Sequence, residues 1–232
     1  LYIYDAYDAY TRVTKRIKIE PQPQETLLPA VENKTELLLQ STSSGGGSGN
    51  PDNSKSQAVL AEVFMLNQST FSPTTTTDPD QTVDPKKGSL KDDFLEIVSR
   101  TVDDGLANTE SQDLTFSVVS SLTESIEYLD DKRVDKVLSI YKNSLAKPAK
   151  VTTKQVTSVV SGLNDLLQVV NKTPPKDQDS DSDEDLNEVN ENSAVYEQVD
   201  DIINSIFDEF IKTGSEFNAS RSNISARFQK VR

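Results

Sequence analysis

Residues 152–170 read TTKQVTSVVSGLNDLLQVV, and this stretch decides the fold class. Thr152 and Gln155 have the spacing of a capping box, in which each side chain accepts a hydrogen bond from the other residue's backbone N–H. The apolar residues that follow recur at the i, i+3, i+4, i+7 spacing of one helix face: Val156, Val159, Val160, Leu163, Leu166, Leu167 and Val170. The stretch therefore predicts an amphipathic helix that buries this face in a core.

Four other stretches between residues 89 and 213 repeat this pattern. Their apolar residues fall on one helix face in residues 90–102, 114–126, 134–145 and 195–210. The links between the middle stretches are short, which favours antiparallel neighbours. We therefore expect a mainly α fold, an antiparallel bundle of about five helices over residues 89–213.

The two ends of the chain have a different character. Residues 1–24 are rich in aromatic and β-branched residues and stop at two prolines, which indicates the terminal hairpin of an upstream Ig-like β domain. Residues 214–232 begin with a glycine and continue with scattered apolar residues, and we expect them to form the strand entry to a following β region. The predicted fold class thus includes flanking strands that belong to β-sandwich regions.

Two further segments break the helical pattern. Residues 25–88 are predicted to be an irregular connector with one helix, which begins at Ser54, and the short apolar run at residues 37–39 favours a strand. Residues 172–192 contain an acidic run with almost no apolar side chain. Because such a segment buries nothing and repels itself, we expect a disordered acidic insertion within the bundle.

The composition excludes several kinds of chemistry. The 38 acidic residues outnumber the 24 basic ones, and a net charge of -14 argues against nucleic-acid binding. The chain has no His and no Cys, so Ser-His-Asp nucleophiles, thiol redox sites and zinc sites are excluded. Acidic residues 177–188 match the ligand positions of an EF-hand loop, but Ser182 replaces the required Gly, which favours a solvated linker. We expect no enzyme, no cofactor, no metal ion and no membrane-inserted segment.

Five asparagines lie in N-x-[ST] sequons without an intervening proline: Asn33, Asn67, Asn171, Asn218 and Asn223. Each lies at the end of a predicted element or in a loop, where a bulky glycan can be accommodated. We predict that they are N-glycosylated; the alternative is that they are ordinary surface asparagines. Asn218 and Asn223 are an odd number of residues apart, so both could carry glycans on one side only if the chain bends between them.

The order of elements resembles one family of ectodomains. Residues 3–5 read IYD, Thr11 follows, and residues 17–21 read IKIEP. These residues look like the last two strands of the Ig-like modules of polycystins and of REJ (receptor for egg jelly) proteins. Residues 116–143 and 151–171 look like the helical subdomain of a GAIN domain. The Cys, Trp and His-Leu-Thr elements of the GAIN proteolysis site are absent, so no autoproteolysis is assigned.

The resemblance implies a non-catalytic, glycosylated ectodomain segment of a large polycystin/REJ-like cell-surface protein. Such a segment would serve as a spacer, adhesion or force-bearing receptor module at the cell surface, on a ciliary membrane if the resemblance holds. Its partners would be other domains of the same chain, protein partners and N-linked glycans. The alternative is an intracellular helical scaffold whose acidic linker is phosphorylated at Ser180 or Ser182.

Overall fold

The computed structural model describes residues 2–4, 10–12, 24–43, 53–71, 84–103, 109–146, 150–172, 185–212, 217–220 and 223–228. Seven α-helices make up the packed body of these residues. They are α1 Gln24–Ser43, α2 Asn53–Phe71, α3 Pro85–Asp103, α4 Thr109–Thr123, α5 Asp131–Leu145, α6 Thr153–Lys172 and α7 Asp185–Ile211, with one 3₁₀ turn, η1 Ile126–Tyr128, before α5.

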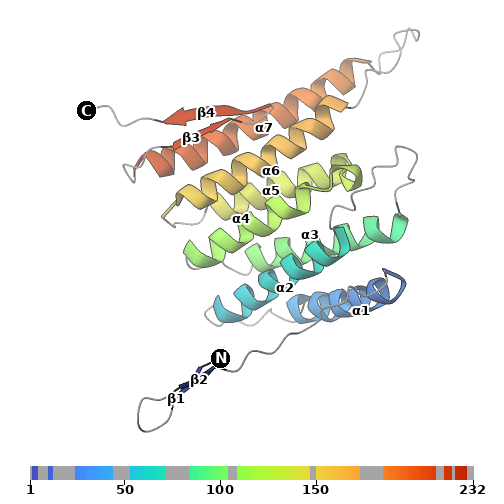
Figure 1. Cartoon of the computed structure of the whole chain (residues 1–232). Helices are drawn as coiled ribbons and strands as arrows, with labels where there is room; N and C mark the ends of the chain where they lie inside the picture. Colours follow the sequence, from blue (N-terminus) through green and yellow to red (C-terminus); the bar gives the residue numbers. More distant parts are fainter. Residues whose placement is uncertain are drawn as a thin grey trace.

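The helices form an open stack of two layers (Figure 1). Helices α1, α3, α5 and α7 follow one another in one layer, and α2, α4 and α6 follow one another in the other. Each helix from α1 to α5 therefore packs against the helix two places further along the chain, and most helices also pack against their sequence neighbours. This is the arrangement of helical repeat arrays, in which a continuous core runs between two layers.

The predicted capping box and helix face at the start of α6 are confirmed. The backbone N–H of Thr152 donates to Gln155 Oε1 over 3.0 Å, and the N–H of Gln155 donates to Thr152 Oγ1 over 3.2 Å. All seven apolar residues of the predicted face are buried. At α5, Asp130 is the N-cap, and its Oδ1 accepts from the N–H of Arg133 over 2.9 Å.

The predicted β-sandwich flanks are wrong. Strand β1 (Tyr2–Tyr4) pairs only with β2 (Tyr10–Arg12), and β3 (Phe217–Ser220) pairs only with β4 (Ser225–Phe228), among the strands described. Both sheets are two-stranded antiparallel hairpins, and the packed body is all-helical. A two-stranded hairpin has too small a face to build a sandwich layer, so these strands provide no Ig-like core.

The bundle of about five helices is also corrected, because residues 25–88 contain two helices of the stack, α1 and α2, instead of a connector with one. The run at residues 37–39 is helical rather than extended. Val31, Thr35 and Leu38 lie on one face of α1 and are buried, and α1 packs against α3. Three consecutive leucines fit a strand or a helix equally well, and here burial against α3 decides in favour of the helix.

The segment predicted to be a disordered acidic insertion, 172–192, is helical in its last part. Helix α7 begins at Asp185 and covers the end of this segment. Residues 173–184, which include Ser180 and Ser182, lie outside the described residues. The buried part of α7 comprises Val199, Ile202, Ile206, Phe207 and Phe210.

Two contacts fix the middle of the stack. Arg133 of α5 bonds Asp92 of α3 through both carboxylate oxygens, at 2.7 and 2.8 Å, and also donates to the carbonyls of Gly88 and Tyr128. Tyr141 of α5 is fully buried against Gly162 of α6, and its hydroxyl has no hydrogen-bond partner among the described residues. Position 162 therefore has room only for glycine, because a side chain there would collide with the Tyr141 hydroxyl.

Candidate functional site

Three of the five predicted glycosylation sites are exposed. Asn33 lies on α1, Asn171 is the next-to-last residue of α6, and Asn223 lies between β3 and β4. Asn218 lies on β3, where it pairs with Arg227 in the register of the hairpin. The chain reverses between β3 and β4, so Asn218 and Asn223 do not lie on one continuous strand.

Asn67 differs from these three, because its side chain is buried, and this burial argues against the predicted glycan. Its side chain is only 2% exposed, between α2 and α4. Its Nδ2 donates to the carbonyl oxygen of Ser121 over 3.1 Å and to Ser121 Oγ over 2.8 Å. A glycan replaces one hydrogen of Nδ2 and must reach solvent, so it is incompatible with this packing. The sequence signal was available, since Asn67 continues the buried face of α2 formed by Leu60 and Val63.

Asn171 and Asn223 lie together, although they are 52 residues apart. Nδ2 of Asn171 donates to Oδ1 of Asn223 over 3.4 Å, and the hydroxyl of Tyr196 on α7 donates to Oδ1 of Asn171. Asn164 of α6 holds Asn223 in turn, because its Oδ1 accepts from the backbone N–H of Asn223 over 3.0 Å. We call these four residues the Asn171 cluster; it joins α6, α7 and the β3–β4 turn.

Lys91 of α3 is a buried charge that sequence reasoning missed. Its side chain is fully buried, and Nζ donates to the carbonyl oxygen of Leu122 over 2.8 Å and to Oδ1 of Asn67 over 3.4 Å. Nζ also lies 4.0 Å from the centroid of the Phe71 ring. A signal was present, because Lys91 stands at the i−3 and i−4 positions of the buried Phe94 and Leu95.

Burial lowers the pKa of Lys91 from 10.5 to about 7, because the low-polarity interior disfavours the charged amine. The carboxylates of Glu127 and Glu124 act in the opposite direction, and the guanidinium of Arg133 lowers the pKa further. Desolvation also raises the pKa of Glu124 itself. A neutral lysine is a nucleophile, but this one is sealed by α2, α3 and α4, so a substrate has no access to it in this conformation.

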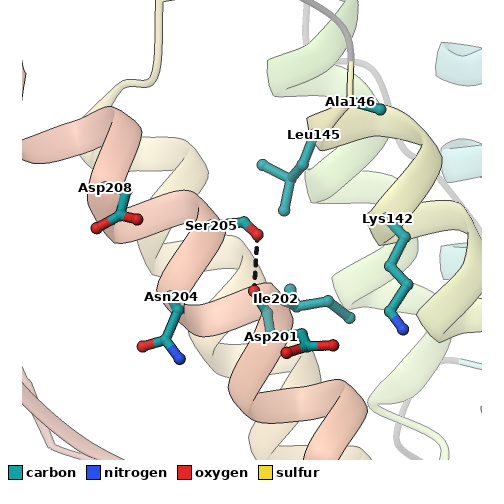
Figure 2. Close-up of a pocket in the computed structure, with 8 residues that line it drawn as sticks. All are labelled: Lys142, Leu145, Ala146, Asp201, Ile202, Asn204, Ser205 and Asp208. Atoms are coloured by element: carbon teal, nitrogen blue, oxygen red, sulfur yellow. Dashed lines mark hydrogen bonds between the residues drawn. The ribbon is translucent and has the colours of Figure 1, made fainter.

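A shallow hollow of about 490 Å³ lies between α5 and α7 (Figure 2). Figure 2 shows Lys142 and Leu145 on the α5 side and Asp201, Ser205 and Asp208 on the α7 side. The hydroxyl of Ser205 is used within its own helix, where it donates to the carbonyl oxygen of Asp201 over 2.7 Å. The hollow thus has charged walls but no pairing of a nucleophile with a base that would support covalent catalysis.

Within the described ranges, no three carboxylates are grouped so that they could hold a metal ion. Over the same residues, no helix combines the length and the apolar character that crossing a bilayer requires. No protein-family model matches this chain, and no curated protein or solved structure matches it either. Among the side chains that the structure describes, the Asn171 cluster brings two predicted modification sites into contact.

Proposed function

We propose that this chain is a non-catalytic, N-glycosylated segment of the ectodomain of a large cell-surface protein of the polycystin and REJ type. It serves as a spacer, adhesion or force-bearing receptor module. The observation that carries the proposal is the placement of Asn33, Asn171 and Asn223 outside the core of a continuous helical stack. Glycans at these positions cover the surface and leave the interior intact.

The stack suits a spacer because its core is continuous along its length. The buried side chains from Val31 on α1 to Phe210 on α7 form one connected cluster. Burying a large apolar side chain contributes about 1.5–3 kcal/mol, so such a core holds its shape without disulfide bonds. The chain has no cysteine, and this core allows the folded protein to be stable outside the cell without disulfide bonds.

The test is site-by-site glycan occupancy in protein purified from its native source. Peptide-N-glycosidase treatment in heavy-oxygen water converts each occupied Asn into a labelled Asp, which peptide mass spectrometry identifies. The proposal expects label at Asn33, Asn171 and Asn223, and none at Asn67, which serves as the internal control. An absence of label at Asn33, Asn171 and Asn223 together would overturn the proposal.

One observation favours a second candidate, an intracellular helical scaffold with a phosphorylated acidic linker. Passage through the secretory pathway exposes the Asn67 sequon to oligosaccharide transfer before α2 packs, and a modified Asn67 cannot occupy its buried position. A chain that never enters this pathway avoids the conflict. Phosphate on Ser180 or Ser182, together with an unmodified Asn171, would establish this candidate instead.

A further inference from the structure

Tyr196 is an exposed aromatic residue fixed beside a predicted glycosylation site. Its side chain is 41% exposed, and its hydroxyl donates to Oδ1 of Asn171, which is itself exposed. No side chain from Ser193 to Gln198 is buried, and Val195 packs only partly against the core. The ring of Tyr196 is thus held in place while its surface stays open.

The geometry of an N-linked glycan places the first sugar on the side of the amide that the Tyr196 hydroxyl contacts. A glycosylated side-chain amide is planar and trans like a peptide bond, so C1 of the sugar lies on the same side of the C–N bond as Oδ1. The Tyr196 hydroxyl approaches Asn171 from the Oδ1 side. One hydrogen remains on Nδ2 after glycosylation, and Oδ1 of Asn223 lies 3.4 Å from this nitrogen.

We propose that Tyr196 is a stacking platform for the first N-acetylglucosamine on Asn171, and that this contact fastens α7 to α6. The face of a sugar ring presents C–H groups with a small positive charge, and the face of a phenol ring is negative. Contact between the two faces covers the exposed aromatic surface. This inference rests on the proposed function, because it requires a glycan at Asn171.

The experiment is a four-protein cycle that separates the glycan from the ring. The full chain is secreted from cells that make oligomannose glycans, and endoglycosidase H then trims each glycan to a single N-acetylglucosamine. The four proteins are the unchanged chain, Thr173→Ala, Tyr196→Ala and the double variant. Thr173→Ala removes the sequon and leaves the Asn171 side chain in place, so the hydrogen bonds of the Asn171 cluster are retained.

The expected result is a glycan effect that depends on Tyr196. Loss of the sugar through Thr173→Ala lowers Tm by about 2–4 °C, the shift that one aromatic contact produces in a chain of this size. In the Tyr196→Ala background the same change leaves Tm unaltered. Equal shifts in both backgrounds, with Asn171 verified as glycosylated, would overturn the stacking contact and leave the proposed function standing.

A second readout does not depend on stability. In the unchanged chain the ring current of Tyr196 moves the proton resonances of the first sugar upfield, and Tyr196→Ala abolishes this displacement in the NMR spectrum. Sugar resonances at the same positions in both proteins would contradict the proposal. An Asn171 without sugar in protein from the native source would overturn the stacking contact and remove a site on which the proposed function depends.

Discussion

Gly162→Ala tests the tightest contact in the stack. A Cβ added at Gly162 would lie 2.1 Å from the Tyr141 hydroxyl oxygen, and Tyr141 is fully buried, so the ring cannot turn aside into solvent. The hydroxyl must retreat by about 1.3 Å to reach the 3.4 Å at which ordinary contact begins. Overpacking of this kind costs about 1–3 kcal/mol, and replacing a helical Gly by Ala returns up to about 1 kcal/mol. Because the overlap is large, we expect a net loss of about 2 kcal/mol in the free energy of unfolding.

The matched control is Tyr141→Phe. The Tyr141 hydroxyl has no partner among the described residues, so removing it leaves no donor or acceptor unpaired, and the stability should change by less than about 1 kcal/mol. In this background the closest atom that Gly162→Ala meets is the ring carbon at 3.3 Å, which has room to shift by a few tenths of an ångström. The cost of Gly162→Ala should then fall below about 0.5 kcal/mol.

Urea unfolding followed by circular dichroism measures all four proteins of this cycle. The expected coupling between the two substitutions is at least about 1.5 kcal/mol. In thermal unfolding, Gly162→Ala alone should lower Tm by about 4–8 °C. A Gly162→Ala variant as stable as the unchanged chain, or one equally destabilised in both backgrounds, would refute the packing of α5 against α6 at this point.

Three other substitutions, Lys91→Met, Arg133→Lys and Asn67→Ala, test the polar interior, and Asn33→Ala on the surface is the control for the last. The pKa of Lys91 is about 7 in the folded chain and 10.5 in the unfolded chain, so the unfolded chain binds more protons between these two pH values. The free energy of unfolding should therefore rise with pH across this window, by at most about 1.4 kcal/mol per pH unit. Lys91→Met should flatten that rise in urea titrations at several pH values. Arg133→Lys loses the two-point bond to Asp92 and should cost about 2 kcal/mol, measured by urea unfolding at constant pH; an unchanged midpoint would contradict the assigned network. Asn67→Ala should lower the free energy of unfolding by about 1–3 kcal/mol, measured by thermal or urea unfolding. Asn33→Ala changes an exposed residue and should alter the free energy of unfolding by less than about 0.5 kcal/mol. Equal effects at the two positions would argue against the burial of Asn67.

Periodicity predicted the elements whose apolar residues occupy one clear face. The capping box at Thr152 and the seven apolar residues of α6 fix both the start and the orientation of that helix, because local hydrogen bonds and burial agree. Helix α1 escaped prediction because residues 37–39 are apolar in succession, and such a run has no period of its own. The open stack escaped prediction as well, since short links determine which helices are neighbours but do not determine whether the row closes into a bundle.

Local sequence patterns also predicted some features of the candidate sites, whereas contacts between residues distant in sequence determined the others. Sequons are local patterns, so they locate Asn33 and Asn171 but do not show which asparagine a neighbouring helix covers. For Asn67 that signal lies in its position on the apolar face of α2. Asn67 is buried because Ser121 and Lys91, distant in sequence, supply its hydrogen-bond partners. Tyr196 lies beside Asn171 for the same reason: only the packing of α7 on α6 brings them together.

A two-layer row of helices differs from a closed bundle in how it tolerates change in length. The main helix contacts in the described residues join helices at most two places apart, so adding or removing a helix pair at the α1 end would leave the contacts among the remaining helices unchanged. The reach of such a protein can therefore be adjusted in steps of one helix pair, while the Asn171 cluster, at the α6–α7 end, keeps the same surroundings.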